Sequence, residues 1–181
     1  MKKLNIGCGR DIREGWINLD SHGKLGADFI WDLKKLPLPF KNNTFDYLYC
    51  GYVLEDFSDP IPLIEEFVRV TKPEGKIEIQ VAHETSGWDS LYHKRGFTMK
   101  ALKDFVQKKD YGKERNLKIV KARFCHQVPG GKLTFRHRLF ILYQKIMAFF
   151  CNFFPSDIID YTFLKYLFTG ISIKIIYQKI K

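Results

Sequence analysis

Residues 1–20 read MKKLNIGCGRDIREGWINLD, with a glycine turn between two short apolar runs. The first run ends at Ile6 and leads directly into Gly7-Cys8-Gly9, and the second run, over 16–19, ends on Asp20. Glycine permits a tight turn and lets a ligand approach the main chain closely. An acid at the end of the next strand can accept hydrogen bonds from ribose hydroxyls. The stretch therefore predicts a nucleotide-type site at the ends of two neighbouring strands.

The spacing of this stretch separates it from two other nucleotide motifs. The dinucleotide fingerprint G-x-G-x-x-G has its acid about 20 residues further on, whereas here Ile12 stands at the third glycine position and Asp20 comes earlier. The chain also has no G-K-[S/T] phosphate loop. A ligand that has a ribose but needs no pyrophosphate cradle fits this pattern. S-adenosylmethionine is such a ligand, with its methionine end at the glycine turn and its ribose at Asp20.

Turn signals divide the chain into short apolar runs that predict an α/β sheet. Strands are expected over 3–6, 16–19, 28–31, 45–50, 75–81, 116–124 and 172–181. The spacing of apolar residues predicts a helix over 60–70, which the segment TKPEG (71–75) ends, and another over 97–109 with Thr98 as its N-cap. Strands that alternate with helices indicate a mostly parallel sheet.

The charges of the chain divide it into two unequal parts. Residues 1–93 hold 11 Lys and Arg against 15 Asp and Glu, and residues 94–181 hold 19 against 5. A solvated, lysine-rich surface is one explanation, and an anionic partner (a phosphate, a nucleic acid or a lipid surface) is the sharper one. We expect one domain over 1–181, with a cofactor-binding half at 1–97 and a basic, aromatic-rich half at 98–181 that covers the substrate.

The cysteine pattern and the N-terminus indicate the compartment. The four cysteines are scattered and form no C-x-x-C pair, so neither a metal site nor a disulfide framework is predicted. Two lysines near the N-terminus are followed by no long apolar run, which argues against a secretory signal. A cytoplasmic protein is expected.

Residues 133–169 differ from the rest of the chain because they contain eleven aromatic residues. The run over 139–154 is apolar nearly all round, but it is shorter than the ~20 residues that a membrane span needs. Two interpretations remain open. We favour a helix that packs on the domain as a lid or a dimer face. The alternative is a helix at a membrane surface, with Arg136, His137 and Arg138 near anionic headgroups.

Three longer stretches carry a resemblance to a known family: LNIGCGRDIREGWINLD, ADFIWDLKKLPLPFKNNTFDYLYCGYVLEDF and LIEEFVRVTKPEGKIEIQVAH. Together they resemble the class I S-adenosylmethionine-dependent methyltransferases, in the small, single-domain, type 11-like branch, over residues 3–97. The resemblance implies a Rossmann-like, doubly wound, mostly parallel seven-stranded sheet, with the aromatic-rich segment inserted as a helix before the last strand. It also implies S-adenosylmethionine as cofactor and S-adenosylhomocysteine as product.

The resemblance also implies which residues hold the cofactor. Gly7, Cys8 and Gly9 would line its methionine end, and Asp20 would bind the ribose. Asp32 and Leu33 would lie beside the adenine. The cofactor would meet the acceptor at Cys50, Gly51 and Tyr52, which follow the fourth strand.

The chain departs from the family pattern in three ways. Asn5 stands where an acid is frequent in the first strand. The link from Gly9 to Trp16 leaves room for a turn or two of the usual first helix. The usual N-terminal cap over the substrate is not expected, so that later segments would have to provide the cover.

Candidate catalytic groups follow the fourth and fifth strands. His93 is the first choice for a general base or a substrate contact, because the family often has a histidine a few residues before Phe-Thr. His83, beside Glu84, and Glu55 are further candidates; Glu55 stands in Leu-Glu-Asp, where the family often has Leu-Glu-His. A structural role is an alternative for each of these residues. His126, with Arg136, His137 and Arg138, could hold a phosphate or a carboxylate.

These observations favour methyl transfer to a small acceptor that is anionic or linked to a lipid or sugar. RNA methylation is an alternative, although no RNA-binding module is visible and the aromatic residues do not interleave with lysines. A non-catalytic binding or scaffold protein is another alternative. Peripheral membrane contact through 136–154 and oligomer formation are left open.

Overall fold

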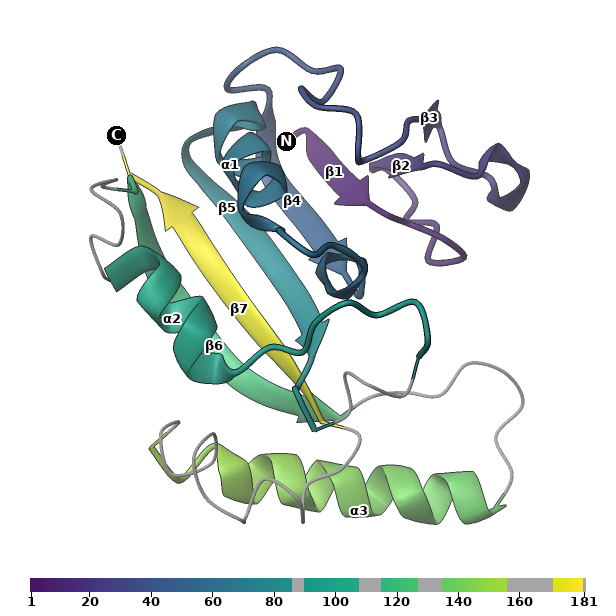
Figure 1. The fold of residues 1–181 in the computed structure, drawn as a ribbon, viewed down its shortest axis with the longest axis vertical. Coiled ribbons are helices and arrows are strands. Elements are labelled where there is room, and N and C mark those ends of the chain that lie inside the picture. Colours follow the sequence, from purple (N-terminus) through teal and green to yellow (C-terminus); the bar gives the residue numbers. More distant parts are fainter. Residues whose placement is uncertain (86–89, 108–114, 127–134, 156–170, 181) are drawn as a thin grey trace.

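The computed structural model describes residues 1–85, 90–107, 115–126, 135–155 and 171–180. A seven-stranded sheet forms the centre of the described molecule (Figure 1). All the predicted strands are present, and their ends differ by one or two residues except at the start of β5. The strands are β1 (Lys3–Ile6), β2 (Ile17–Asp20), β3 (Phe29–Ile30), β4 (Phe45–Gly51), β5 (Thr71–Ala82), β6 (Leu117–His126) and β7 (Ile171–Lys179).

The sheet has the order β3-β2-β1-β4-β5-β7-β6. The pairs from β3 to β5 are parallel, whereas β7 runs antiparallel to both of its neighbours. The chain builds outward from β1 to β3 and then crosses back to β4, so the strand order reverses between β1 and β4. In open α/β sheets, ligands bind beyond the carboxyl ends of the strands at such a reversal. The predicted Rossmann-like sheet is confirmed, and its topology places a ligand site beyond β1, β2 and β4.

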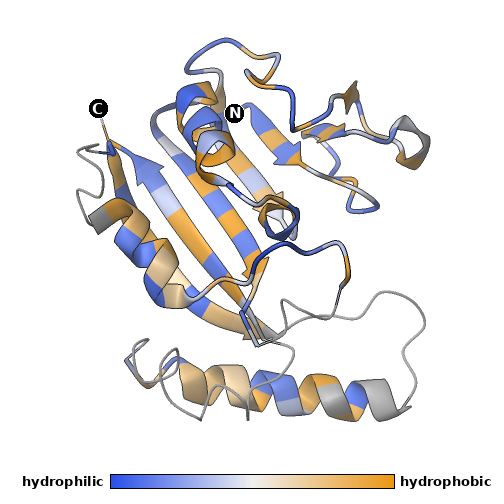
Figure 2. Ribbon diagram, in the orientation of Figure 1, coloured by the Kyte–Doolittle hydropathy of each residue, from blue (hydrophilic) through white to orange (hydrophobic). Residues whose placement is uncertain are grey.

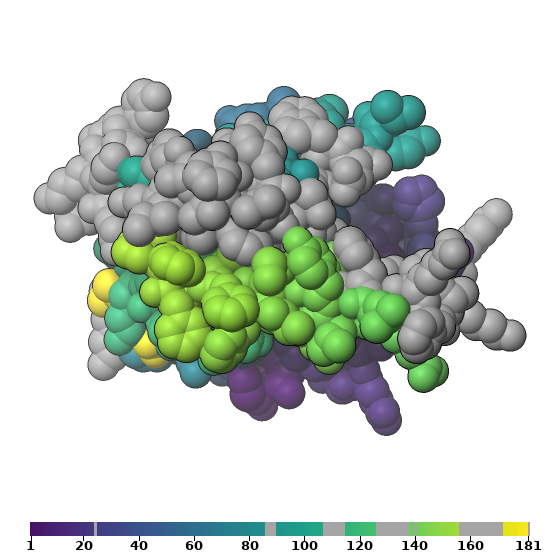
Figure 3. All heavy atoms as spheres, turned by 90° about the horizontal axis from the view of Figure 1, so that it is seen from below, coloured from purple at the N-terminus to yellow at the C-terminus, as the bar shows by residue number. Residues whose placement is uncertain are grey.

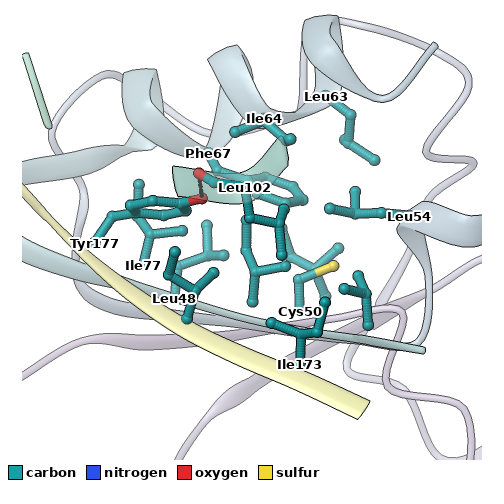
Figure 4. Close-up of a cluster of buried hydrophobic side chains, with 14 of the residues drawn as sticks. Leu48, Cys50, Leu54, Leu63, Ile64, Phe67, Ile77, Leu102, Ile173 and Tyr177 are labelled. Atoms are coloured by element: carbon teal, nitrogen blue, oxygen red, sulfur yellow. Dashed lines mark hydrogen bonds between the residues drawn. The ribbon is translucent and has the colours of Figure 1, made fainter. Parts of the chain in front are cut away.

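Two helices, α1 (Ile61–Val70) and α2 (Met99–Gln107), cover the front face of the sheet (Figure 1). Thr98 caps α2 as predicted, because its hydroxyl accepts a hydrogen bond from the Ala101 N–H at 3.0 Å. Apolar and polar residues alternate along the central strands (Figure 2), and the apolar ones point toward the helices. Each fully buried aliphatic side chain stabilises the fold by roughly 1.5–3 kcal/mol. The core labelled in Figure 4 comprises Leu48, Cys50, Leu54, Leu63, Ile64, Phe67, Ile77, Leu102, Ile173 and Tyr177.

The back face of the sheet is polar. Glu78 of β5 forms an ion pair with Lys174 of β7 at 2.6 Å and accepts a hydrogen bond from the Tyr47 hydroxyl. The guanidinium of Arg13 lies 3.5 Å from the centre of the Tyr49 ring. Arg13 belongs to the link after Gly9, which forms turns and no helix, although its length left room for a turn or two of one. Polar and aromatic side chains therefore cover the part of the sheet where a first helix would have packed.

The start of β5 differs from the prediction. The segment 71–75 was expected to be a turn, but β5 begins at Thr71, directly after α1. Phe45 pairs with Thr71 and Tyr47 pairs with Lys76, so the residues between Thr71 and Lys76 bulge out of the ladder. Glu74 has a φ of 66° within this bulge. The turn-forming residues of TKPEG thus interrupt the strand pairing without ending the strand.

The third helix, α3 (Phe135–Cys151), lies between β6 and β7 in the chain, as predicted for the aromatic-rich insertion. It crosses the face shown in Figure 3, where it is coloured light green. Gln144, Ala148 and Cys151 form its buried side. At its end, Asn152 accepts a hydrogen bond from the Phe124 N–H at 2.9 Å and donates one to the Phe124 carbonyl at 3.1 Å. These two bonds satisfy the main chain of the edge strand β6 and fix α3 against it.

The outer side of α3 is apolar. Exposed Arg138 and Lys145 also lie on this helix. The exposed apolar side chains of α3, with those of Phe153 and Phe154 just after it, are Leu139, Leu142, Tyr143, Ile146, Phe149, Phe150, Phe153 and Phe154. Within the described ranges, no helix combines the length and the apolar character that crossing a membrane requires.

Candidate active site

The glycine turn after β1 requires glycine at its first position. Gly7 has a φ of 63°, a conformation that is costly for other residues. A Cβ atom at Gly7 would also lie 2.2 Å from a methyl carbon of Val53, in the loop after β4. Gly9 has a φ of 49°, but a Cβ atom there would meet nothing within 4 Å. The main chain at Gly7 therefore packs closely against the loop after β4, and both segments line the same cleft.

Asp20 closes the other side of the glycine turn. Its carboxylate accepts hydrogen bonds from the N–H groups of Gly9 and His22, both at 2.9 Å. Partial burial raises the pKa of Asp20, but these hydrogen bonds outweigh burial and lower that pKa overall. Asp20 is thus ionised at neutral pH. From the sequence, Asp20 was expected to bind the ribose of the ligand. In the structure its carboxylate also holds the glycine turn that would bind the ligand.

A buried amide pair supports the turn from behind. The side chain of Asn5, which is 1% exposed, donates to the Asp11 carbonyl at 2.6 Å and to Asn18 Oδ1 at 3.0 Å. Asn18 in turn donates to Asp28 Oδ2 at 2.9 Å and accepts from the Arg13 N–H at 2.9 Å. Asn5 therefore holds the loop after the glycine turn in place through buried hydrogen bonds. Asn18 and Asp28 were not identified from the sequence, because only the pairing of β1 with β2 brings them together.

A cleft of about 540 Å³ lies beyond the carboxyl ends of β1, β2 and β4. This volume falls within the range of about 300–1,000 Å³ that is usual for cofactor sites. Five of the nine residues predicted to bind the cofactor line it: Gly7, Asp20, Asp32, Leu33 and Tyr52. The remaining lining residues were not singled out from the sequence: Ser21, His22, Lys34, Val53, Asp56, Phe57, Tyr92 and Lys94. Ser21, Lys34 and Val53 could have been found, because they directly follow the predicted site residues Asp20, Leu33 and Tyr52.

The other four predicted cofactor residues lie behind the surface of the cleft. Gly9 supports Asp20 through its N–H, and Gly51 ends β4. Cys8 and Cys50 are buried, and burial raises the pKa of both thiols, most strongly at Cys50. Both cysteines are therefore protonated at neutral pH and pack as small apolar residues.

Tyr52 links the cleft to the back face of the sheet. It has a φ of 56°, and its N–H donates to the Gln80 carbonyl at 2.8 Å. Its hydroxyl accepts a hydrogen bond from Gln80 Nε2 at 2.7 Å. Backbone strain at a non-glycine residue costs on the order of 1–3 kcal/mol and is frequent at ligand sites. Two bonds to the same residue of β5 hold this strained conformation in place.

The catalytic candidate Glu55 is fully buried beside the cleft. Its Oε1 accepts a hydrogen bond from the Ala82 N–H at 2.5 Å, while its Oε2 has no partner among the described residues. Burial raises the pKa of Glu55, and this outweighs the lowering by the Ala82 N–H and by the charge of nearby His93. The Glu55 carbonyl also accepts from the Lys94 N–H at 2.7 Å. Glu55 thus holds the segment around residue 93 against the end of β5.

The two histidine candidates occupy different surroundings. His93 is half-buried near Glu55, between the cleft-lining residues Tyr92 and Lys94. His83 is 2% exposed and lies outside the cleft; its Nδ1 is 3.0 Å from the hydroxyl of Thr85. Its ring packs edge-on against Phe124. Glu84, its neighbour, donates its main-chain N–H to the Phe97 carbonyl at 2.8 Å.

The structure describes only one of the four side chains that were expected to hold a phosphate or a carboxylate in residues 98–181. Arg138 is exposed on α3. The side chains of His126, Arg136 and His137 lie outside the part of the structure that is described.

Residues 8–79, which run from the second residue of the glycine turn through β2, β3 and β4 into β5, match the family model "Methyltransferase domain". Over this part the chain is similar to the methyltransferase domain family. A demethylmenaquinone methyltransferase of Bacillus pumilus is 37% identical over 62 residues, which are 34% of this chain and 25% of that protein. The matched part thus spans about a quarter of the length of the curated relatives.

Solved structures with this fold match nearly the whole chain. A putative methyltransferase from Bacillus halodurans superposes with a TM-score of 0.62 at 12% identity, over 99% of this chain and 93% of that one. An S-adenosylmethionine-dependent methyltransferase from Archaeoglobus fulgidus gives 0.58 at 18% identity, over 98% and 86%. At such low identity the likeness concerns the fold.

S-adenosylmethionine is the cofactor of the methyltransferases that the chain resembles, and the cleft residues fit it. Each carboxylate oxygen has two lone pairs, so Asp20 can accept hydrogen bonds from ribose hydroxyls in addition to those from Gly9 and His22. Gly7 lines the cleft, so a ligand bound there can approach its main chain. Leu33 and Phe57 provide apolar surface for an adenine ring.

Proposed function

We propose that the chain transfers a methyl group from S-adenosylmethionine to a small acceptor. The observation that carries this proposal is the cleft between Gly7 and Asp20, at the reversal of strand order. Bound S-adenosylmethionine supplies an activated methyl group. The protein then mainly has to hold the acceptor in line with that group, so proximity and orientation provide most of the rate.

Tyr52 and the loop after β4 would orient the two reactants. Tyr52 lines the cleft. Gln80 holds its conformation through hydrogen bonds to both its main-chain N–H and its hydroxyl. Val53 contacts the glycine turn, so a shift of this loop would also move the cofactor-binding main chain. The acceptor would therefore meet the cofactor beside Tyr52.

His93 is our candidate for a general base, where the acceptor must lose a proton. It lies between two residues of the cleft, and buried Glu55 is close enough for the charges of the two side chains to interact. We expect His93→Asn to lower kcat by about 100-fold or more, as loss of a general base does, and to leave the affinity for S-adenosylmethionine unchanged. A parallel loss of cofactor affinity would assign His93 a structural role instead.

The acceptor would be small and would carry an anionic or a lipid- or sugar-linked group. The curated relatives are named for demethylmenaquinone, a small molecule. The basic balance of residues 94–181 supports an anionic group. The exposed apolar side of α3, with exposed Arg138 and Lys145, supports peripheral contact with an anionic membrane. Co-sedimentation with phosphatidylglycerol vesicles and not with phosphatidylcholine vesicles tests this contact.

Calorimetric titration with S-adenosylmethionine and S-adenosylhomocysteine tests the cofactor site. Wild type should bind both, and Asp20→Asn should weaken binding at least about ten-fold, because it removes a charged acceptor. Asp46→Asn is the matched control, since Asp46 also accepts a main-chain hydrogen bond, from the Lys2 N–H, but lies outside the cleft. Equal affinity of the Asp20 variant and wild type, or no binding to folded wild type, would refute the proposal.

A further inference from the structure

A second cavity, of about 410 Å³, lies between α3 and the back face of the sheet, and we name it the back pocket. Strands β5, β6 and β7 supply one wall. Gln80 pairs with Lys174, and Lys174 pairs with Arg123, so these three side chains stand in a row across neighbouring strands. Lys145 and Phe149, one turn apart on α3, supply the opposite wall.

The charges of the back pocket are unbalanced. Three cations line it, Arg123, Lys145 and Lys174, and no carboxylate is among its lining residues. Glu78 neutralises Lys174 from the side, at 2.6 Å. Across the described ranges, neither Arg123 nor Lys145 forms an ion pair with an acidic residue.

The pairing of Arg123 with Lys174 is a second sign that an anion belongs in this place. The two residues lie directly opposite each other on antiparallel strands. Like charges in this position destabilise a sheet. The ion pair with Glu78 accounts for the cation at Lys174. Among the described residues no ion pair accounts for the cation at Arg123, and a bound anion would balance its charge.

The back pocket shares a wall with the cofactor cleft. Gln80 lines the back pocket, and its Nε2 donates to the hydroxyl of Tyr52 at 2.7 Å. Tyr52 lines the cleft. The same Nε2 lies 3.3 Å from the hydroxyl of Ser172 on β7. One side chain and one hydrogen bond thus separate the two cavities.

We propose that the back pocket binds a phosphate or diphosphate group of the methyl acceptor. Arg123 offers a planar fork of donors that matches phosphate oxygens, and the two lysines add point charges. Phe149 and Ala148 offer apolar surface to the part of the acceptor next to the phosphate. The proposal deepens the function proposed above, because the anchored acceptor would reach the cofactor past Gln80 and Tyr52.

Calorimetric titration with inorganic pyrophosphate tests the back pocket without any methyl transfer. The double variant Arg123→Gln, Lys145→Gln removes two exposed cations of the pocket. The control, Lys118→Gln with Lys121→Gln, removes two exposed cations from the same strand, β6, outside the pocket. We expect the pocket variant to lose about ten-fold or more in affinity for pyrophosphate and the control to lose much less. Equal losses in both variants, or unchanged affinity in the pocket variant, would overturn the proposal.

Two further arms identify the source of the phosphate. Glycerol 3-phosphate is added in solution, and phosphatidic acid is presented in phosphatidylcholine vesicles. Pocket-dependent binding to the first supports a free phosphate ester, and pocket-dependent binding to the second supports a lipid headgroup. Binding to neither would overturn the proposal.

The pocket variants should bind S-adenosylmethionine as wild type does. Cofactor binding without pocket-dependent pyrophosphate binding would refute the back pocket alone. Pyrophosphate binding that depends on the pocket, without any cofactor binding, would refute the proposed methyl transfer and leave the anion site standing.

Discussion

At Gly7, two constraints act on one residue, and substitution separates them. Gly9→Ala would meet only the strain of a positive φ, about 1–2 kcal/mol. Gly7→Ala would meet similar strain and also the contact of 2.2 Å with Val53. We therefore expect Gly7→Ala to lower the free energy of unfolding more than Gly9→Ala and to abolish cofactor binding. Urea denaturation and calorimetry measure the two effects. Equal effects of the two variants would contradict the close packing of Gly7 on the loop after β4.

The buried carboxyl of Glu55 predicts an unusual dependence of stability on pH. Its pKa is raised above the ordinary value of 4.5, chiefly by burial. The folded state thus holds this proton more tightly than the unfolded state does. The contribution of Glu55 to stability is present in full below about pH 4.5 and is lost as the pH rises through the folded pKa. Glu55→Gln, which does not titrate, should therefore gain stability relative to wild type as the pH rises.

Urea denaturation of wild type and variant between about pH 4 and about pH 8 checks this sign. Glu66→Gln is the matched control, because the ion pair with Arg69 is the main cause of the lowered pKa of Glu66. For Glu66 the contribution is present above the unfolded pKa and is lost as the pH falls, so this variant should lose stability relative to wild type as the pH rises. Curves of the same sign for both variants would contradict the assignment for Glu55.

Residues whose role is local in the sequence could be predicted, and residues whose role depends on strand pairing could not. Gly7 and Asp20 stand at the ends of adjacent strands, and their spacing alone indicated a shared site. Asn18 lies in a predicted strand with nothing in its neighbours to show that Asn5 and Asp28 would bind it. Glu55 was found as a candidate, but its burial depends on the end of β5 and on the segment around residue 93, which meet it only in the fold.

Asn152 connects α3 to the rest of the fold, and its removal should loosen that connection. Its side chain forms hydrogen bonds with both main-chain polar groups of Phe124 and with the Ala148 carbonyl. We expect Asn152→Ala to cost about 1–3 kcal/mol, because polar groups of β6 lose their partner. Hydrogen exchange of the Phe124 amide should also become faster. Asn116→Ala, at the exposed opposite end of β6, is the control and should change neither quantity.

The helices and strands could be predicted in their order along the chain. The bulge in β5 and the exposed side of α3 could not. The periodicity of 3.6 along PIPLIEEFVRV predicted a helix within one residue of its observed bounds. The periodicity of 2 along KIEIQVA predicted a strand and the position of its end, but not its start. The bulge in β5 escaped prediction because TKPEG has the residues of a turn, and only the partner strand β4 shows that pairing resumes after it. The apolar run over 139–154 predicted a helix, whereas its exposed outer side depends on where α3 lies on β6.

The whole molecule is asymmetric in both packing and charge. Helices α1 and α2 cover the front face of the sheet (Figure 1). The back face carries exposed Arg123 and half-buried Lys174, which line one pocket with residues of α3. The overall excess of cations in residues 94–181 was visible in the sequence. The sequence did not show that three of these cations line one pocket, because β6, β7 and α3 are separated in the chain and meet only in the fold.

This asymmetry predicts that salt acts differently on the two ligands. The back pocket is lined by cations alone among its charged residues, whereas the cleft mixes Asp20, Asp32 and Asp56 with Lys34 and Lys94. Between about 0.1 M and about 1 M salt the Debye length falls from about 10 Å to about 3 Å. The affinity for pyrophosphate should therefore fall by several-fold or more across this range, and the affinity for S-adenosylmethionine should change far less. Calorimetry at both salt concentrations measures the two affinities on the same protein. A similar loss in the Arg123→Gln, Lys145→Gln variant would mean that the net charge of the chain attracts pyrophosphate without a defined site, whereas a loss confined to wild type would place the attraction in the back pocket.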